Sequence, residues 1–182
     1  MAWTAPKTWS VGDVLTAADM NAYVRDNTKW LGTDKPAARA YRSTSFSHNS
    51  SGNWLSIALD SERADTGSTG LHSTSSNTER MTVPTGGGGW YLATGHISWD
   101  SDTVGDRLVG IEVNGTNGGG TFVAQDRAAG AAVGSRQSVA AVFRLVAGDY
   151  FVLSAFQNSG GTRTISSTAQ YTAELAAVWL GT

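Results

Sequence analysis

The chain has 182 residues, of which 15% are charged, and it contains 22 glycines, 7 tryptophans and no cysteine. The lack of cysteine excludes a disulfide framework, a thiolate metal site and a cysteine nucleophile. The chain has 13 basic and 15 acidic residues, so it has no excess of positive charge to bind a phosphate backbone. Nucleic acid is therefore not an expected partner. No apolar run of about 18 residues occurs, so no membrane insertion is expected. Few charges and many glycines favour an all-β protein.

Residues 1–36 differ from the rest and are expected to form an N-terminal arm and one short α-helix. The hydroxyl of Thr16 can cap the helix, and Asp19, three residues later, can pair with the cap in return. Gly32 is the predicted end of the helix, with Pro36 shortly beyond it. Asn27 interrupts an apolar stripe at helical spacing, which consists of Met20, Tyr23, Val24, Trp30 and Leu31.

One helix of this length cannot bury its own apolar side. It has to pack on its own domain, on copies of itself or on a partner. Tryptophans that precede the helix add apolar surface and favour an anchor to a partner, because aromatic side chains often dominate binding energy. The predicted anchor residues are Trp3, Trp9, Leu15, Met20, Tyr23, Val24, Trp30 and Leu31.

Residues 37–182 are expected to form an all-β domain. Apolar side chains recur here at every second position, as in Val139, Ala141 and Phe143. Clusters of Gly, Asn, Asp and Ser separate such stretches about every ten residues, which is typical of a sandwich or jelly roll. Glycines 118–120 are interpreted as a hairpin tip. The predicted strands are 40–46, 53–59, 80–83, 90–99, 107–113, 121–125, 139–146, 150–156, 163–166 and 171–180.

Few motifs in the chain could carry chemistry. The three histidines are isolated, and neither a nucleophile motif nor a phosphate-binding loop is present. Asp100, Asp102 and Asp106 lie within seven residues and form a weak calcium candidate, because Ca²⁺ prefers carboxylate and carbonyl oxygens. The alternative is an ordinary solvated turn. No carboxylate pair has the context of a glycosidase, so neither an enzyme nor a cofactor is expected.

Four segments of the β half resemble the C1q/TNF-like jelly roll, a trimeric module of ten strands. They are the glycine-aromatic strand entry at 89–95, the hairpins at 106–115 and 145–153, and the closing strand at 172–180. The resemblance covers roughly residues 38–182 and implies an all-β jelly-roll sandwich that forms a homotrimer. In that family central strands make the trimer contacts, so the resemblance implies core or trimer-interface positions for Tyr91, Tyr150, Phe151 and Trp179.

The N-terminal segment resembles the opening of tailed-bacteriophage virion proteins. The matching residues are 9–21, with the pattern W-x-x-G-D-x-L-T-A-A-x-x-N, followed by 24–27 and 30–31. The resemblance implies a non-enzymatic virion surface protein, either a capsid fibre or decoration protein or a minor tail protein, which assembles in the host cytoplasm. Residues 1–36 would then anchor it to other virion proteins.

Two other functions stay open. The chain could be a host-surface carbohydrate-binding adhesin, with the loops 66–77 and 123–136 as candidate contacts, because loops on rigid scaffolds often bind ligands. Trimeric display would strengthen such a weak contact with a glycan. A glycan hydrolase is the least favoured alternative.

Overall fold

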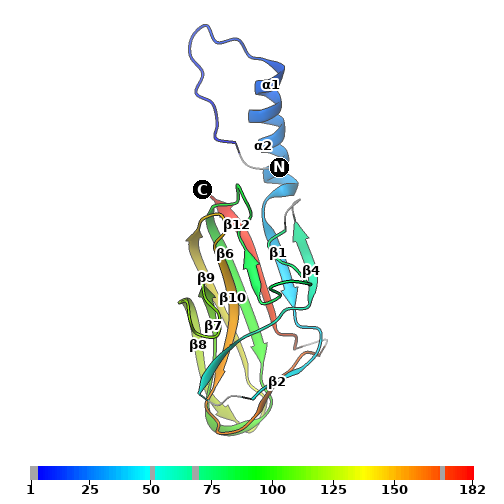
Figure 1. The fold of residues 1–182 in the computed structure, drawn as a ribbon, viewed down its shortest axis with the longest axis vertical. Helices are drawn as coiled ribbons and strands as arrows, with labels where there is room; N and C mark the ends of the chain where they lie inside the picture. Colours follow the sequence, from blue (N-terminus) through cyan, green and yellow to red (C-terminus); the bar gives the residue numbers. More distant parts are fainter. Residues whose placement is uncertain (1–3, 50–51, 67–69, 169–170) are drawn as a thin grey trace.

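Two antiparallel sheets pack face to face, and a helical segment stands beyond one end of them (Figure 1). The computed structural model describes residues 4–49, 52–66, 70–168 and 171–182. No helix among these residues has the length and apolar character needed to cross a membrane. The arrangement confirms the predicted fold class, an all-β sandwich preceded by an arm and one short helix.

The helical segment runs without a break from Ala17 to Asp34. It consists of α1 (Ala17–Asp19), the π-helical η1 (Met20–Asp26), α2 (Asn27–Lys29) and the π-helical η2 (Trp30–Asp34). The predicted capping box of Thr16 and Asp19 is confirmed, with Asp19 N–H donating to the Thr16 hydroxyl at 3.1 Å. The predicted end at Gly32 is wrong. The helix continues to Asp34, two residues beyond Gly32. It ends there because Lys35 is extended, as expected for a residue before proline.

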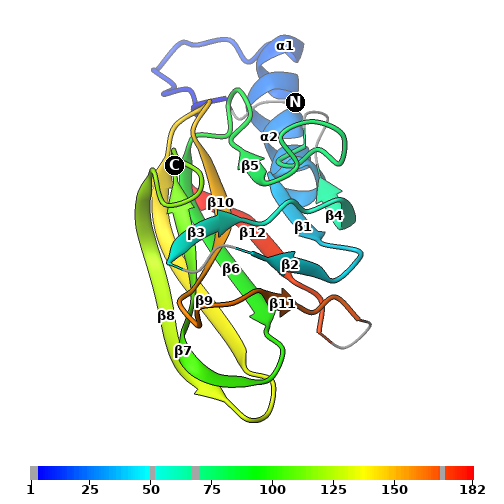
Figure 2. The same cartoon turned by 60° about the horizontal axis from the view of Figure 1, so that its bottom comes forward.

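In the described part of the chain, twelve strands follow the helix. Five of them form the first sheet in the order β4-β1-β12-β6-β9, and β3-β10-β7-β8 form the second, in which β5 also pairs with β10. A small third sheet pairs β2 with β11 (Figure 2). The strands are β1 (Ala37–Tyr41), β2 (Phe46–His48), β3 (Asn53–Ser56), β4 (Ser61–Thr66), β5 (Arg80–Thr82), β6 (Gly89–Ser98), β7 (Asp102–Val113), β8 (Thr121–Ala131), β9 (Arg136–Leu145), β10 (Tyr150–Gln157), β11 (Arg163–Ile165) and β12 (Glu174–Gly181).

The core lies between the two large sheets. Tyr91 of β6, Phe143 of β9 and Phe151 of β10 are buried there, and the rings of Phe143 and Phe151 meet edge to face at 5.5 Å. Gly89, where β6 begins, has a φ of +145°, and a Cβ there would lie 2.1 Å from the carbonyl oxygen of Gly181. The glycine therefore lets β6 and β12 approach closely at the end nearest the helix.

Several predicted strands differ from those of the structure. The stretch 40–46 is divided between β1 and β2, which belong to different sheets. The strand β4 was not predicted, because an edge strand with a largely polar sequence lacks the apolar alternation that signals a strand. The strand β8 continues to Ala131, so most of the predicted loop 123–136 is strand. The predicted hairpin tip at 118–120 is confirmed between β7 and β8.

Candidate self-association and anchoring surfaces

The first sheet carries apolar side chains on the face that points away from the core. Leu92 lies at the centre of this outer face, and its register partners are Val142 of β9 and Val178 of β12. Trp90, Val142 and Leu180 are 45%, 56% and 52% exposed. A shallow hollow of about 150 Å³ opens at Leu92 and Val178. A contiguous apolar patch on a sheet face is typical of a surface that binds another protein. The outer-face patch consists of Trp90, Leu92, Ala140, Val142, Ala176, Val178 and Leu180.

Three of the four aromatic residues predicted for the trimer interface or the core lie on the inner side. Tyr91 and Phe151 are fully buried, and Trp179 is 4% exposed. These three belong to the core of one chain. Tyr150 is half-buried at the start of β10, where the guanidinium of Arg80 lies 4.2 Å from its ring centroid. For Tyr91, Phe151 and Trp179 the structure therefore favours the core alternative of the prediction, because successive side chains in a strand point to opposite faces and these three point inward.

The outer-face patch was not predicted, although the sequence contains a signal for it. Residues 90–93 and 175–180 are apolar at consecutive positions, without the polar alternation expected of a strand with one face in water. Continuous apolar runs are typical of strands that are buried on both faces. The signal becomes specific once the register pairs β12, β6 and β9 and aligns their outer positions in rows.

The same outer face becomes polar toward the end far from the helix. Glu174 of β12, which is 4% exposed, accepts hydrogen bonds from Arg39 of β1 and from Arg63 of β4, the latter at 2.8 Å. Burial alone would raise the pKa of the Glu174 carboxyl, but the hydrogen bonds from the two guanidinium groups outweigh burial and lower it. The two arginines therefore hold a buried carboxylate in its charged form.

This carboxylate makes the stability of the sandwich depend on acid. Because the pKa of Glu174 is lowered on folding, its stabilising contribution is full above its ordinary value of 4.5 and is lost as the pH falls through the folded value. We expect Glu174→Gln to reduce the free energy of unfolding at pH 7, and the difference from the wild type to shrink as the pH falls below about 4. Urea unfolding at a series of pH values measures this difference.

Glu79→Gln is the matched control, because Glu79 pairs with Arg80 at 3.1 Å on a partly exposed surface. Such a pair contributes about 0–1 kcal/mol. A wild-type advantage over Glu174→Gln that stays constant down to pH 3 would contradict the assignment.

The helical segment divides its apolar residues between two sides. Trp30 is 2% exposed, and its ring meets that of Trp179 edge to face at 4.3 Å. Its predicted role as an anchor is therefore wrong, because the side chain closes the core of its own domain. Met20, Val24 and Leu31 are 43%, 51% and 50% exposed.

The N-terminal arm folds back along the helix and is held by Asn27, whose contact with the arm was not predicted. Asn27, 5% exposed, accepts a hydrogen bond from the N–H of Thr4 at 3.0 Å and donates one to its carbonyl oxygen at 2.8 Å. Its amide also lies 3.3 Å from the carbonyl oxygen of Tyr23. Asn27, which interrupts the apolar stripe, thus bonds the start of the arm to the helix, and the arm forms a closed loop (Figure 1).

Apolar side chains of this loop remain uncovered. Trp9 is 43% exposed, with the ammonium of Lys7 4.3 Å from its ring centroid, and Leu15 is 56% exposed. A groove of about 440 Å³ separates the arm from the helix and is lined by Trp9, Leu15, Met20, Tyr23 and Val24 together with three other residues. The predicted anchor residue Trp3 lies outside the described residues.

Arginines pair with two of the three aspartates of the calcium candidate. Asp102 forms an ion pair with Arg163 at 2.6 Å, and Asp106 forms one with Arg127 at 2.7 Å. Asp100 accepts a hydrogen bond from the N–H of Thr164 at 3.1 Å. Within the part of the chain that the structure describes, no three acidic or histidine side chains gather as a metal site. The described residues therefore give the calcium candidate no support, since two of its three carboxylates are paired with arginines.

Comparison with known proteins supports the fold. No family model and no curated protein sequence matches the chain. Murine APRIL at pH 5.0 superposes with a TM-score of 0.59 at 15% identity, over 81% of this chain and 100% of that one. The globular domain of the zebrafish complement 1qA protein gives a TM-score of 0.53 at 13% identity, over 80% of this chain and 98% of that one. The chain therefore has the jelly-roll fold of TNF/C1q-like domains.

Proposed function

We propose that this chain is a non-enzymatic structural component of a tailed-phage virion. It forms a homotrimer through the outer-face patch and is attached to the particle through its N-terminal segment, as a capsid fibre or decoration protein or a minor tail protein. The jelly roll is then displayed on the virion surface.

The observation that carries the proposal is that the chain has two separate exposed apolar surfaces, one on the sandwich and one on the N-terminal segment. The outer-face patch belongs to the sandwich and lies on the inner strands β12 and β6 and on the adjoining edge strand β9. Its position on β12 and β6 agrees with the central-strand trimer contacts that the resemblance implies. Burial of such a patch between copies is favourable at about 25 cal/mol per Å² of apolar surface. In a cyclic trimer each copy turns the same face toward the three-fold axis, so a ring of three copies covers the patch in all of them.

The second surface lies on the arm and the helix. Trp9, Leu15, Met20 and Val24 line one groove and leave apolar atoms in contact with water. They fall within the segment that resembles the opening of virion proteins. A surface that extends beyond one end of the sandwich leaves the opposite end free to face outward (Figure 1). The fold neighbours cover about four-fifths of the chain, so their likeness leaves a stretch the length of this segment unexplained.

The attachment is tested on virions of the phage that encodes the chain, prepared without the protein and then incubated with purified variants. Trp9→Ala combined with Val24→Asp is expected to lower particle occupancy at least tenfold, because an apolar contact is lost and a charge is buried. Quantitative immunoblotting of sedimented particles measures the occupancy. Val133→Asp is the matched control, since Val133 is 75% exposed in the turn between β8 and β9, at the far end of the sandwich. Full occupancy by the double variant would refute the anchor.

A further inference from the structure

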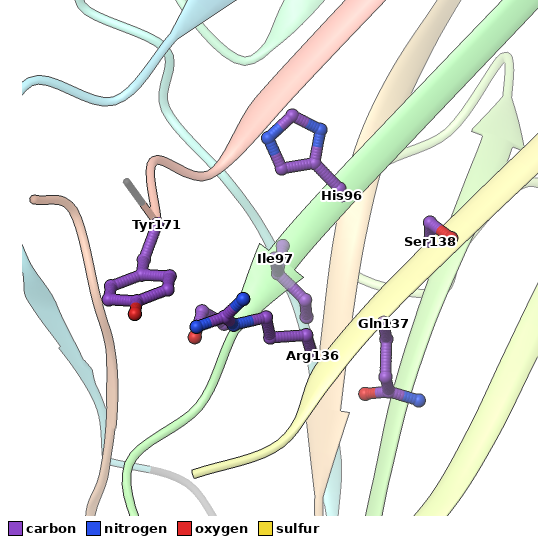
Figure 3. A pocket seen from close by; sticks show the side chains of 7 residues that line it. His96, Ile97, Arg136, Gln137, Ser138 and Tyr171 are labelled. Carbon is purple, nitrogen blue, oxygen red and sulfur yellow. The ribbon is translucent and has the colours of Figure 1, made fainter. Parts of the chain in front are cut away.

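The polar end of the outer face contains a hollow that neither the core nor the outer-face patch uses. It has a volume of about 170 Å³, and its lining includes His96 of β6, Arg136 and Ser138 of β9, and Tyr171 from the segment before β12. Figure 3 shows the Arg136 side chain extending toward the ring of Tyr171, with His96 and Ser138 on neighbouring strands. The hollow has room for one small molecule, on the order of six waters at about 30 Å³ each.

Arg136 supplies a cation without a carboxylate partner. Its guanidinium lies 3.9 Å from the centroid of the Tyr171 ring, and this contact holds the side chain in place. Among the described residues, no carboxylate lies within ion-pair distance of Arg136, whereas Arg163, Arg127 and Arg63 all have one. Its planar fork of N–H donors suits the two oxygens of a carboxylate.

The rest of the lining also favours an anion with hydroxyl groups. The hydroxyls of Ser98 and Ser138 and the ring of His96 can form hydrogen bonds with a polar ligand, and no acidic residue lines the hollow. Glu174 is the register partner of His96, but its carboxylate is already bound by two arginines of its own sheet. The negative charge of Glu174 is therefore compensated by the two arginines rather than free to repel an anion.

We propose that this hollow binds the carboxylate of an acidic sugar, such as a uronic acid at the end of a surface glycan. Arg136 pairs with the carboxylate, and the serine hydroxyls and His96 bond the ring hydroxyls. The choice of a glycan as the source rests on the proposed function as a displayed virion protein. A simple anion would use Arg136 alone and would leave the serine hydroxyls without a ligand partner.

In the test, the full chain is titrated separately with glucuronate, glucose and acetate. Binding is monitored by the NMR chemical shifts of the His96 and Ser138 backbone amides. Glucuronate is expected to shift both signals saturably and to bind more tightly than acetate. Glucose is expected to cause no shift. Arg136→Gln should weaken glucuronate binding at least tenfold, and Ser138→Ala should weaken it several-fold. Arg144→Gln is the matched control, because Arg144 lies on the same strand and removes the same charge.

Three results would overturn the proposal: no saturable shift with glucuronate, equal affinity for acetate, or an equal loss in Arg144→Gln. The second result would define a simple anion site. Failure of the glycan site is distinguishable from failure of the proposed function. The Arg136→Gln variant is expected to keep the oligomeric mass and the particle occupancy of the wild type. A chain that binds glucuronate and does not attach to virions would refute the virion role alone.

Discussion

Replacement of Leu92 by aspartate is expected to dissociate the proposed trimer into monomers. Leu92 lies at the centre of the outer-face patch, between Val142 and Val178. A charge at this position would be buried once in each copy, and removal of a carboxylate from water costs several kcal/mol even after relaxation. Light scattering coupled to size-exclusion chromatography is expected to give three times the chain mass for the wild type and a single chain mass for Leu92→Asp.

The monomeric variant should remain folded, because Leu92 is only half-buried within one chain and points away from its core. Val133→Asp adds the same charge at a residue that is 75% exposed, and it should keep the wild-type mass. A monomeric wild type, or a Leu92→Asp chain that remains trimeric, would show that the outer-face patch is not the interface. Circular dichroism shows whether Leu92→Asp is folded. If it is not, the mass measurement is repeated with Val142→Asp, because the Val142 side chain is 56% exposed in one chain and its replacement should leave the fold intact.

Trp30→Ala is expected to destabilise the chain by about 3–5 kcal/mol, the usual cost of truncating a buried tryptophan to alanine. The ring of Trp30 is 2% exposed and packs edge to face on Trp179, so its removal opens a cavity where the helix joins the sandwich. Urea unfolding followed by tryptophan fluorescence measures the change.

Trp9→Ala supplies the comparison, because Trp9 is 43% exposed on the arm and its loss should change the free energy of unfolding by about 0.5 kcal/mol or less. The two variants therefore separate a core role from an anchoring role. Equal stability of Trp30→Ala and the wild type would mean that the helix does not close the core, and that Trp30 belongs with the anchor residues after all.

Local patterns determined most of the secondary structure. The Thr16–Asp19 capping box and the hairpin tip at 118–120 were predictable because each depends on a few adjacent residues. The alternation of β9 was readable because one of its faces is buried in the core and the other contains polar residues. The class of fold followed from the number and spacing of such strands.

Only the tertiary structure decided which side of each strand meets the core. Consecutive apolar residues, such as Trp90 and Tyr91, look equivalent in the sequence, and the pairing of β6 with β12 and β9 places one outside and the other inside. The same holds for Trp30, whose neighbours on the helix remain exposed while its own ring meets a tryptophan 149 positions later.

The polar sites depended on long-range contacts as well. Asp102 and Asp106 resemble cation ligands in the sequence, and arginines distant in the chain neutralise them. Arg136 shows the reverse case, since it becomes a candidate anion site only when folding places it beside Tyr171 and away from every described carboxylate. Composition and spacing thus determined the sandwich, the arm and the helix. The surfaces that could assemble, attach or bind were decided by the strand register, because register sets which side chains share a face.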